Sequence, residues 1–396
     1  MRDFKTTLPL ALYIHFPWCV RKCPYCDFNS HAVVNNVVPG NDYVDALIRD
    51  LEFELPRIWG RSISSIFMGG GTPSLFSAEA IGRLLSILRT HLNLAPGCEI
   101  TLEANPGTAE AARFCGYRET GINRISIGVQ SFADPILRRL GRVHNGEQAI
   151  FAIELARQAG FENINLDIMY GLPGQSVADA IQDLEIAVGF NTTHLSWYQL
   201  TIEPNTVFYS DPPQLPDEDL LWDMQHEGSH CLAGHDFQQY EVSAYARGRS
   251  FCNHNLNYWR FGDYLGIGAG AHGKITDRAT GTINRYARHR IPETYQRLAG
   301  KPEAIVSQQQ LSVADTLLEF MMNAMRLTEG VTTELFTEHT GLSIDAAARK
   351  LQQARDRNLI DYDSKHIKPT ELGRRYLNDL LQIFMHDTPA QPVPAG

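Results

Sequence analysis

Two patterns of apolar and polar positions alternate along the first 200 residues of the chain. Short apolar runs predict strands at residues 10–15, 64–68, 99–104, 123–129, 163–169 and 194–200. Amphipathic stretches predict helices between them at residues 42–55, 77–92, 108–120, 134–140, 146–159 and 176–188. Strands that alternate with helices imply an α/β fold with a parallel sheet and right-handed crossovers. About six such units favour an incomplete (β/α)6 TIM-type barrel, with a doubly wound open sheet as the alternative.

The alternation ends after residue 200. A Pro-rich connection at residues 211–217 precedes a predicted helix near 218–233 and a predicted strand at 240–246. The polar segment 281–302 is typical of a linker. We therefore expect a barrel core at residues 1–240 and a core extension with a linker at 241–300.

A different pattern marks the C-terminal part. Predicted helices at 313–325, 343–358 and 370–384 accompany an apolar pair of segments around a polar turn at residues 363–365. Helices plus a hairpin predict a small winged-helix-like α+β domain at 301–386, followed by a disordered Pro-rich tail at 387–396. Acidic residues outnumber basic ones in this domain, which favours a packing or substrate-covering module over a DNA-binding one.

Composition narrows the class of protein. Hydrophobic residues make up 43 % of the 396 residues, which is enough for a sizeable core and excludes a disordered chain. The net charge of −10 argues against a nucleic-acid partner, because phosphate contacts need clustered Lys and Arg. No apolar run of membrane-spanning length and no signal-peptide core occur, so we expect a cytoplasmic protein.

Three of the seven cysteines lie close together, directly after the first predicted strand. Cys19, Cys23 and Cys26 follow a C-x3-C-x2-C spacing. Thiolates at this spacing can bind three irons of one cubane cluster and leave the fourth iron with an open position. A zinc site completed by His15 or His31 is the alternative at this point.

Polar or Gly-rich residues follow the predicted strands. The second strand ends in GGGTP at residues 69–73, the third in EANP at 103–106 and the fourth in Gln130. Asp167 lies on the fifth strand. Because the carboxyl ends of barrel strands meet at one rim, these residues predict a ligand site there.

The cysteine spacing resembles that of radical S-adenosylmethionine (SAM) enzymes. The segments YIHFPWC (13–19), GGGTP, EANP, GVQSF (128–132) and LGR (140–142) are similar to the oxygen-independent coproporphyrinogen III dehydrogenase family over nearly the whole chain. This resemblance implies a 4Fe-4S cluster held by Cys19, Cys23 and Cys26, with SAM at the open iron. The residues that the resemblance implies as SAM contacts are Tyr13, Gly70, Gly71, Thr72, Glu103, Gln130, Arg142 and Asp167. We expect Tyr25, beside Cys26, to pack on the adenine and His272 to line the same site.

Three features resemble a sister branch of that family, the heme chaperones. Phe28 stands where the dehydrogenase has a further cysteine, and only nine residues precede Leu10. The sequence HNLNYW at residues 254–259 resembles the HNxxYW motif of the chaperone branch. The resemblance implies heme binding with His254 as an axial ligand, and Cys252 and His272 are rival ligands.

The function that we predict is heme binding and transfer to client hemoproteins such as respiratory enzymes. We expect the protein to associate with a membrane only through such clients. A homodimer is one alternative for its oligomeric state. A chaperone of this kind need not be an enzyme. Radical decarboxylation of coproporphyrinogen III and a zinc-binding structural or regulatory role are the alternative functions.

Overall fold

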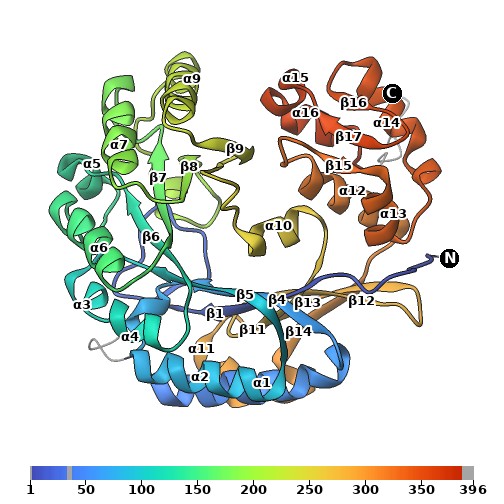
Figure 1. The fold of residues 1–396 in the computed structure, drawn as a ribbon, viewed down its shortest axis with the longest axis horizontal. Helices are drawn as coiled ribbons and strands as arrows, with labels where there is room; N and C mark the ends of the chain where they lie inside the picture. The colour runs from blue at the N-terminus through green and yellow to red at the C-terminus, as the bar shows by residue number, and fades with distance from the viewer. Residues whose placement is uncertain (1, 34–37, 386–396) are drawn as a thin grey trace, which may run out of the picture.

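The computed structural model describes residues 2–33 and 38–385, so the predicted disordered tail lies outside the described residues. Its centre is a 12-stranded sheet with the order β14-β13-β12-β11-β1-β4-β5-β6-β7-β8-β10-β9 (Figure 1). Six consecutive strands of this sheet run parallel: β1 (Leu10–Phe16), β4 (Ser62–Gly70), β5 (Asn93–Ala104), β6 (Arg124–Gln130), β7 (Asn163–Tyr170) and β8 (His194–Gln199). Strand order thus follows chain order, as in a barrel.

The barrel is open between β8 and β1. On the side away from β4, β1 pairs with β11 (Asp263–Ile267). On the side away from β7, β8 pairs with β10 (Ala244–Ala246). The connecting helices are α1 (Gly40–Ile58), α2 (Ala78–His91), α3 (Thr108–Ala111), α4 (Phe114–Glu119), α5 (Asp134–Arg139), α6 (Gly146–Gln158) and α7 (Val177–Gly189). The predicted incomplete (β/α)6 barrel is therefore confirmed.

Successive side chains of each strand point alternately to the helix-covered core and to the barrel interior. On β1, Leu12 and Ile14 are fully buried in the main hydrophobic cluster, whereas Tyr13 between them lines a cavity. Local signals place the helices: Ser77 accepts a hydrogen bond from the Ala80 amide at the start of α2, and Ser176 forms a capping box at the start of α7.

The segment predicted as a linker is part of the sheet instead. Strands β12 (His272–Asp277), β13 (Thr282–Arg288) and β14 (Ile305–Gln310) extend it, and α11 (Pro292–Leu298) packs beside α1. Arg288 gives β13 its polar character, yet this side chain is buried and pairs with Asp50 and Glu54 of α1. A tertiary ion pair of this kind leaves no local sequence pattern. The predicted strand at 240–246 is a hairpin of β9 (Gln238–Glu241) and β10.

The C-terminal part has its own hydrophobic cluster. Helices α12 (Val313–Ala324), α13 (Thr333–Thr340) and α14 (Ala348–Asp356) pack with a three-stranded sheet of β15 (Val331–Thr332), β17 (His366–Pro369) and β16 (Ile360–Tyr362). The predicted last helix is interrupted at Tyr376, which divides it into α15 (Glu371–Arg375) and α16 (Leu377–Gln382). This arrangement confirms the small winged-helix-like α+β domain.

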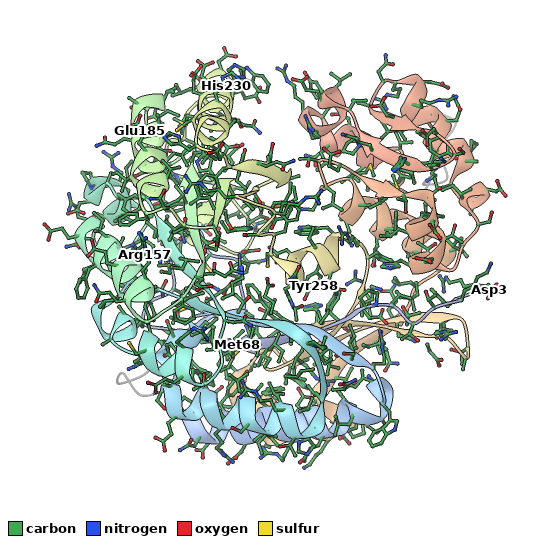
Figure 2. The ribbon with its side chains drawn as sticks, in the orientation of Figure 1. Asp3, Met68, Arg157, Glu185, His230 and Tyr258 are labelled. Carbon is green, nitrogen blue, oxygen red and sulfur yellow. The ribbon has the colours of Figure 1, made fainter. Side chains whose placement is uncertain are left out.

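Helix α10 (Asn253–Trp259) lies between the barrel and the C-terminal part, where Tyr258 is labelled in Figure 2. Leu256 of α10 and Phe4 near the N-terminus belong to the hydrophobic cluster of the C-terminal part. Two further helices, α8 (Val207–Ser210) and α9 (Glu218–Gly234), follow β8. Within residues 2–33 and 38–385, no helix has the length and apolar character needed to cross a membrane.

Candidate functional site

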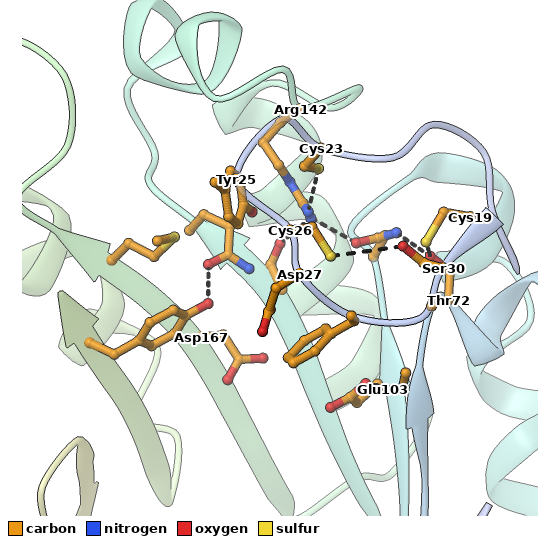
Figure 3. Close-up of a pocket in the computed structure, with 18 of the residues that line it drawn as sticks. Cys19, Cys23, Tyr25, Cys26, Asp27, Ser30, Thr72, Glu103, Arg142 and Asp167 are labelled. Carbon is orange, nitrogen blue, oxygen red and sulfur yellow. Dashed lines mark hydrogen bonds between the residues drawn. The ribbon is translucent and has the colours of Figure 1, made fainter. Parts of the chain in front are cut away.

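A cavity of about 370 Å³ lies at the carboxyl ends of the parallel strands (Figure 3). We call it the cysteine cavity, because Cys19, Cys23 and Cys26 all line it. The other predicted site residues that line it are Tyr25, Gly70, Gly71, Thr72, Glu103, Gln130, Arg142 and Asp167. The structure thus brings together side chains from a loop and four different strand ends, as expected for a barrel rim.

Backbone hydrogen bonds close the loop that carries the cysteines. Strand β2 (Trp18–Cys19) pairs with β3 (His31–Ala32), and the His31 amide donates to the Pro17 carbonyl oxygen at 2.7 Å. Within the loop, the Cys26 amide donates to the Cys23 carbonyl oxygen at 3.1 Å. The three thiols are therefore presented to one cavity by a loop whose two ends are held together.

Each thiol has a polar neighbour. Thr72 Oγ1 donates to Cys19 Sγ at 3.3 Å, and Arg142 Nη1 donates to Cys23 Sγ at 3.6 Å. Ser30 Oγ lies 3.8 Å from Cys26 Sγ. Burial raises the pKa of the Cys19 and Cys26 thiols, so a metal must displace their protons when it binds. Three thiols on one cavity, with donors directed at sulfur, fit a cluster held by three ligands.

Glycine is required where β4 meets the cysteine loop. The Gly71 amide donates to the Phe16 carbonyl oxygen at 2.7 Å, and a Cβ atom on Gly71 would lie 2.6 Å from the Trp18 carbonyl oxygen. Gly70 has a φ of +108°, and a Cβ atom there would overlap the ring of His15. Backbone can approach this closely only without side chains, which explains the glycine run.

Arg142 connects the loop to the strand ends. Its Nη2 donates to Asn105 Oδ1 and to the Gly128 carbonyl oxygen, both at 2.7 Å. The Tyr198 hydroxyl donates to Gln130 Oε1 at 2.7 Å, and both residues line the cysteine cavity. These contacts hold polar groups of the cysteine cavity in place before any ligand binds.

Two carboxyl groups form the floor of the cysteine cavity. Glu103 Oε2 accepts from the Gly70 amide at 3.1 Å, and Asp167 accepts from Ser126 Oγ at 2.9 Å and Asn165 Nδ2 at 2.8 Å. Burial, reinforced by the nearby Asp167 carboxylate, raises the pKa of Glu103 to about 8. Burial also raises the pKa of Asp167. Glu103 therefore keeps its proton at neutral pH and can donate a hydrogen bond.

A second cavity, of about 380 Å³, continues the barrel interior toward the strand starts. We call it the His254 cavity. Five residues line both cavities, namely Phe28, Gly70, Glu103, Ser126 and Asp167, and along β6 the lining moves from Gln130 to Arg124. The remaining residues that line the His254 cavity are Tyr13, Phe67, Asn165, Ser196, His254, Asn255, Tyr258 and Trp259.

His254 enters this cavity from α10. Its amide donates to Glu99 Oε1 at 3.1 Å, and the Asn253 amide donates to Glu99 Oε2 at 3.2 Å, so a carboxylate of β5 caps the helix. The imidazole stacks on Phe67 with ring centroids 5.0 Å apart. Its Nδ1 lies 3.1 Å from Ser65 Oγ, whereas its buried Nε2 has no hydrogen-bond partner among the described residues.

Three predicted residues lie away from the cysteine cavity. Tyr13 lines the His254 cavity instead. His272 is exposed at the start of β12 and lines neither cavity. Cys252 is buried next to the cap of α10, where its Sγ donates to Glu99 at 3.6 Å. These positions follow from the strand alternation and the α10 packing.

Among the residues of these cavities that sequence reasoning did not single out are Asn105, Tyr198 and Arg124. Asn105 lies within the EANP segment, so its place at the end of a predicted strand could have identified it. Tyr198 and Arg124 stand inside apolar strand patterns, where a single polar residue at an inward position is the signal that could have identified them.

Comparison with known proteins gives the class first. Residues 13–187 match the Radical SAM superfamily, and residues 311–376 match the HemN C-terminal domain. The solved structure of coproporphyrinogen III oxidase (HemN) from Escherichia coli, a radical SAM enzyme, superposes with a TM-score of 0.80. It shares 24 % identity over 96 % of this chain and 90 % of that chain, which shows a common fold. Residues 13–187 therefore form a radical SAM domain, and the radical SAM family implies a 4Fe-4S cluster and SAM.

Full-length relatives give the family. The heme chaperone HemW of Haemophilus influenzae is 49 % identical over 381 residues, covering 95 % of this chain and 98 % of that protein. The heme chaperone HemW of Escherichia coli is 48 % identical over 377 residues, with the same coverage. At this identity and coverage, the chain belongs to the HemW family.

Proposed function

We propose that this protein is a heme chaperone that binds heme in the His254 cavity and passes it to client hemoproteins. The names of its relatives support heme as the cargo. The observation in the structure that carries the proposal is the unpartnered Nε2 of His254, a buried nitrogen that faces an aromatic-walled cavity.

The surroundings of His254 suit an axial ligand. Burial, together with the Arg124 guanidinium, lowers the pKa of His254 to about 3, so the ring is neutral at physiological pH. The Ser65 hydroxyl can accept a hydrogen bond from Nδ1–H, which leaves the Nε2 lone pair free for a metal. Phe67 and Tyr258 contact the ring on two sides and fix its orientation.

We propose further that Cys19, Cys23 and Cys26 hold the cluster and that the polar groups of the cysteine cavity bind SAM. The bound cluster supplies one-electron chemistry. In this chain its proposed role is to control heme transfer or oligomeric state, and a homodimer is part of the proposal. Arg142 is placed to bind a carboxylate, and Gln130 and Asp167 are placed to bind hydroxyl groups. Client proteins, including membrane-bound respiratory enzymes, are the proposed heme acceptors.

The test is anaerobic titration of the cluster-loaded protein with hemin, with 5′-deoxyadenosine measured in the same samples. A chaperone gives a Soret shift that saturates, and His254→Ala and His254→Gln lose it while their iron and sulfide contents stay unchanged. His272→Ala is the matched control, because that imidazole lies outside both cavities.

The same preparations test the alternative enzyme. Incubation with coproporphyrinogen III, SAM and a reductant should leave the porphyrinogen unchanged. Formation of protoporphyrinogen IX would assign the chain to radical decarboxylation instead. Unchanged hemin binding in both His254 variants would reject His254 as the ligand.

A further inference from the structure

A buried arginine without a partner lies in the His254 cavity. Arg124, the first residue of β6, is 2 % exposed and lines this cavity. Across residues 2–33 and 38–385, its guanidinium forms no ion pair within 4.0 Å and no hydrogen bond, and its buried Nε atom has no partner. Burying a cation is unfavourable unless anions accompany it, and here the carboxylates of Glu99 and Asp167 act on the guanidinium only through space, without a direct hydrogen bond.

The carboxyl groups that interact electrostatically with Arg124 accept hydrogen bonds from other donors. Glu99 accepts from the amides at the start of α10, and Asp167 accepts from Ser126 and Asn165. Glu103 accepts from the Gly70 amide. None of the three contacts Arg124 directly, although each is close enough to interact electrostatically. The guanidinium therefore has donors available for a further acceptor.

The rest of the cavity limits what that acceptor can belong to. Besides Arg124, the His254 Nε2 and the Trp259 Nε1 are buried here without partners in the described part of the chain. Tyr13, Phe67 and Tyr258 supply aromatic walls. A ligand that satisfies these groups together has a flat apolar ring, a metal that takes one imidazole, and an anionic group beside the metal-bearing ring.

We propose that the Arg124 guanidinium binds a propionate carboxylate of the porphyrin whose iron His254 ligates. This inference rests on the proposed function and adds the orientation of the heme within the cavity. A guanidinium can donate two parallel hydrogen bonds to one carboxylate, which fixes the porphyrin in rotation as well as in position. The cavity would then bind two parts of the ligand: the metal through His254 of α10 and the propionate through Arg124 of β6.

The experiment compares hemin with hemin dimethyl ester, in which both propionates are neutral. Wild-type, cluster-loaded protein should bind hemin about tenfold to a hundredfold more tightly than the ester, as expected for loss of a charged hydrogen bond. Arg124→Met should bind the two ligands equally, with the affinity that wild type shows for the ester. Arg138→Met, the same change at an exposed arginine, should keep the wild-type preference.

The outcomes separate this inference from the proposed function. Equal binding of hemin and ester by wild-type protein, with a Soret band that depends on His254, would overturn the role of Arg124 and keep the chaperone. Binding of neither ligand would overturn both. Because the wild-type comparison needs no variant, the test stands even where Arg124→Met folds poorly. Arg124→Lys then provides a second variant. The logarithm of its affinity ratio for hemin over the ester should be less than half of the wild-type value, because an ammonium cannot donate two parallel hydrogen bonds to one carboxylate.

Discussion

The cysteine cavity and the His254 cavity share a wall but differ in how their polar groups are satisfied. In the cysteine cavity, Arg142 donates to Asn105, Gly128 and Cys23. In the His254 cavity, the Arg124 guanidinium makes no hydrogen bond and the His254 Nε2 has no partner within the described residues. The first site is organised before a ligand arrives, whereas the second leaves its strongest groups for the ligand. Groups of the second kind indicate where binding energy is to be gained.

The largest effect that we expect separates the two arginines. Arg142→Met removes the donor from Asn105 Oδ1 and the Gly128 carbonyl oxygen, which should cost about 2–4 kcal/mol of stability. Arg124→Met removes a cation that makes no hydrogen bond and interacts with Glu99 and Asp167 only through space, so the free protein should lose less stability than in Arg142→Met. Thermal unfolding of both variants without ligand measures the difference. Equal destabilisation by the two changes would remove the distinction between the cavities.

A second expectation concerns the backbone between the cysteine loop and β4. In Gly71→Ala, the new methyl group would lie 2.6 Å from the Trp18 carbonyl oxygen, which should cost about 1–3 kcal/mol and displace the loop. Iron incorporation should fall as well. Gly189→Ala is the control, since no atom lies within 4 Å of a Cβ atom there. Normal iron content in Gly71→Ala would show that this contact does not position the thiols.

The Glu103 carboxyl, which lines both cavities, should make the stability of the protein depend on pH. Burial, with the nearby Asp167, raises the pKa of Glu103 from 4.5 to about 8, so the folded state holds a proton that the unfolded chain releases. This contribution to stability is present below pH 4.5 and is lost as the pH rises toward 8. Glu103→Gln, which keeps an acceptor for the Gly70 amide, should flatten that loss in melting temperature measured against pH. Parallel curves for wild type and variant would contradict a protonated Glu103.

The smallest effect should appear at acidic pH and concerns His254. Burial lowers the pKa of His254 from 6.5 to about 3, so its contribution to stability is present above pH 6.5 and declines as the pH falls toward 3. His254→Gln should reduce the slope of the acid limb of the stability curve. Only part of that limb will change, because burial also lowers the pKa of His15 and His144. An unchanged slope would mean that the imidazole is already charged in the folded state.

Most of the cysteine cavity could be predicted from the sequence, whereas the part that Arg124 plays in the His254 cavity could not, although the HNLNYW motif pointed to His254. Strand ends of a parallel barrel converge by topology, so Glu103, Gln130 and Asp167 were found from their place after apolar runs. Arg124 begins a strand and faces a cavity completed by α10, a helix 129 residues further along the chain. Only the packed structure shows that its guanidinium is buried and unpartnered.

The extension of the sheet was missed for a related reason. Residues 282–288 carry two arginines and an asparagine, which is typical of a surface segment. In the structure, Arg288 is buried against Asp50 and Glu54, and Arg285 pairs with Glu319. Partners that are distant in sequence make these charges compatible with a strand, and no local pattern records them.

Substitution of single cysteines tests the central claim most directly, namely that three thiols of one loop hold the cluster. Cys19→Ala, Cys23→Ala and Cys26→Ala, reconstituted anaerobically, should each lose most of their iron, sulfide and visible absorbance, because each removes one ligand from one cavity. Cys115→Ala, at an exposed cysteine, should match wild type. Full iron and sulfide in any of the three variants, or zinc without sulfide in the wild-type protein, would contradict the account.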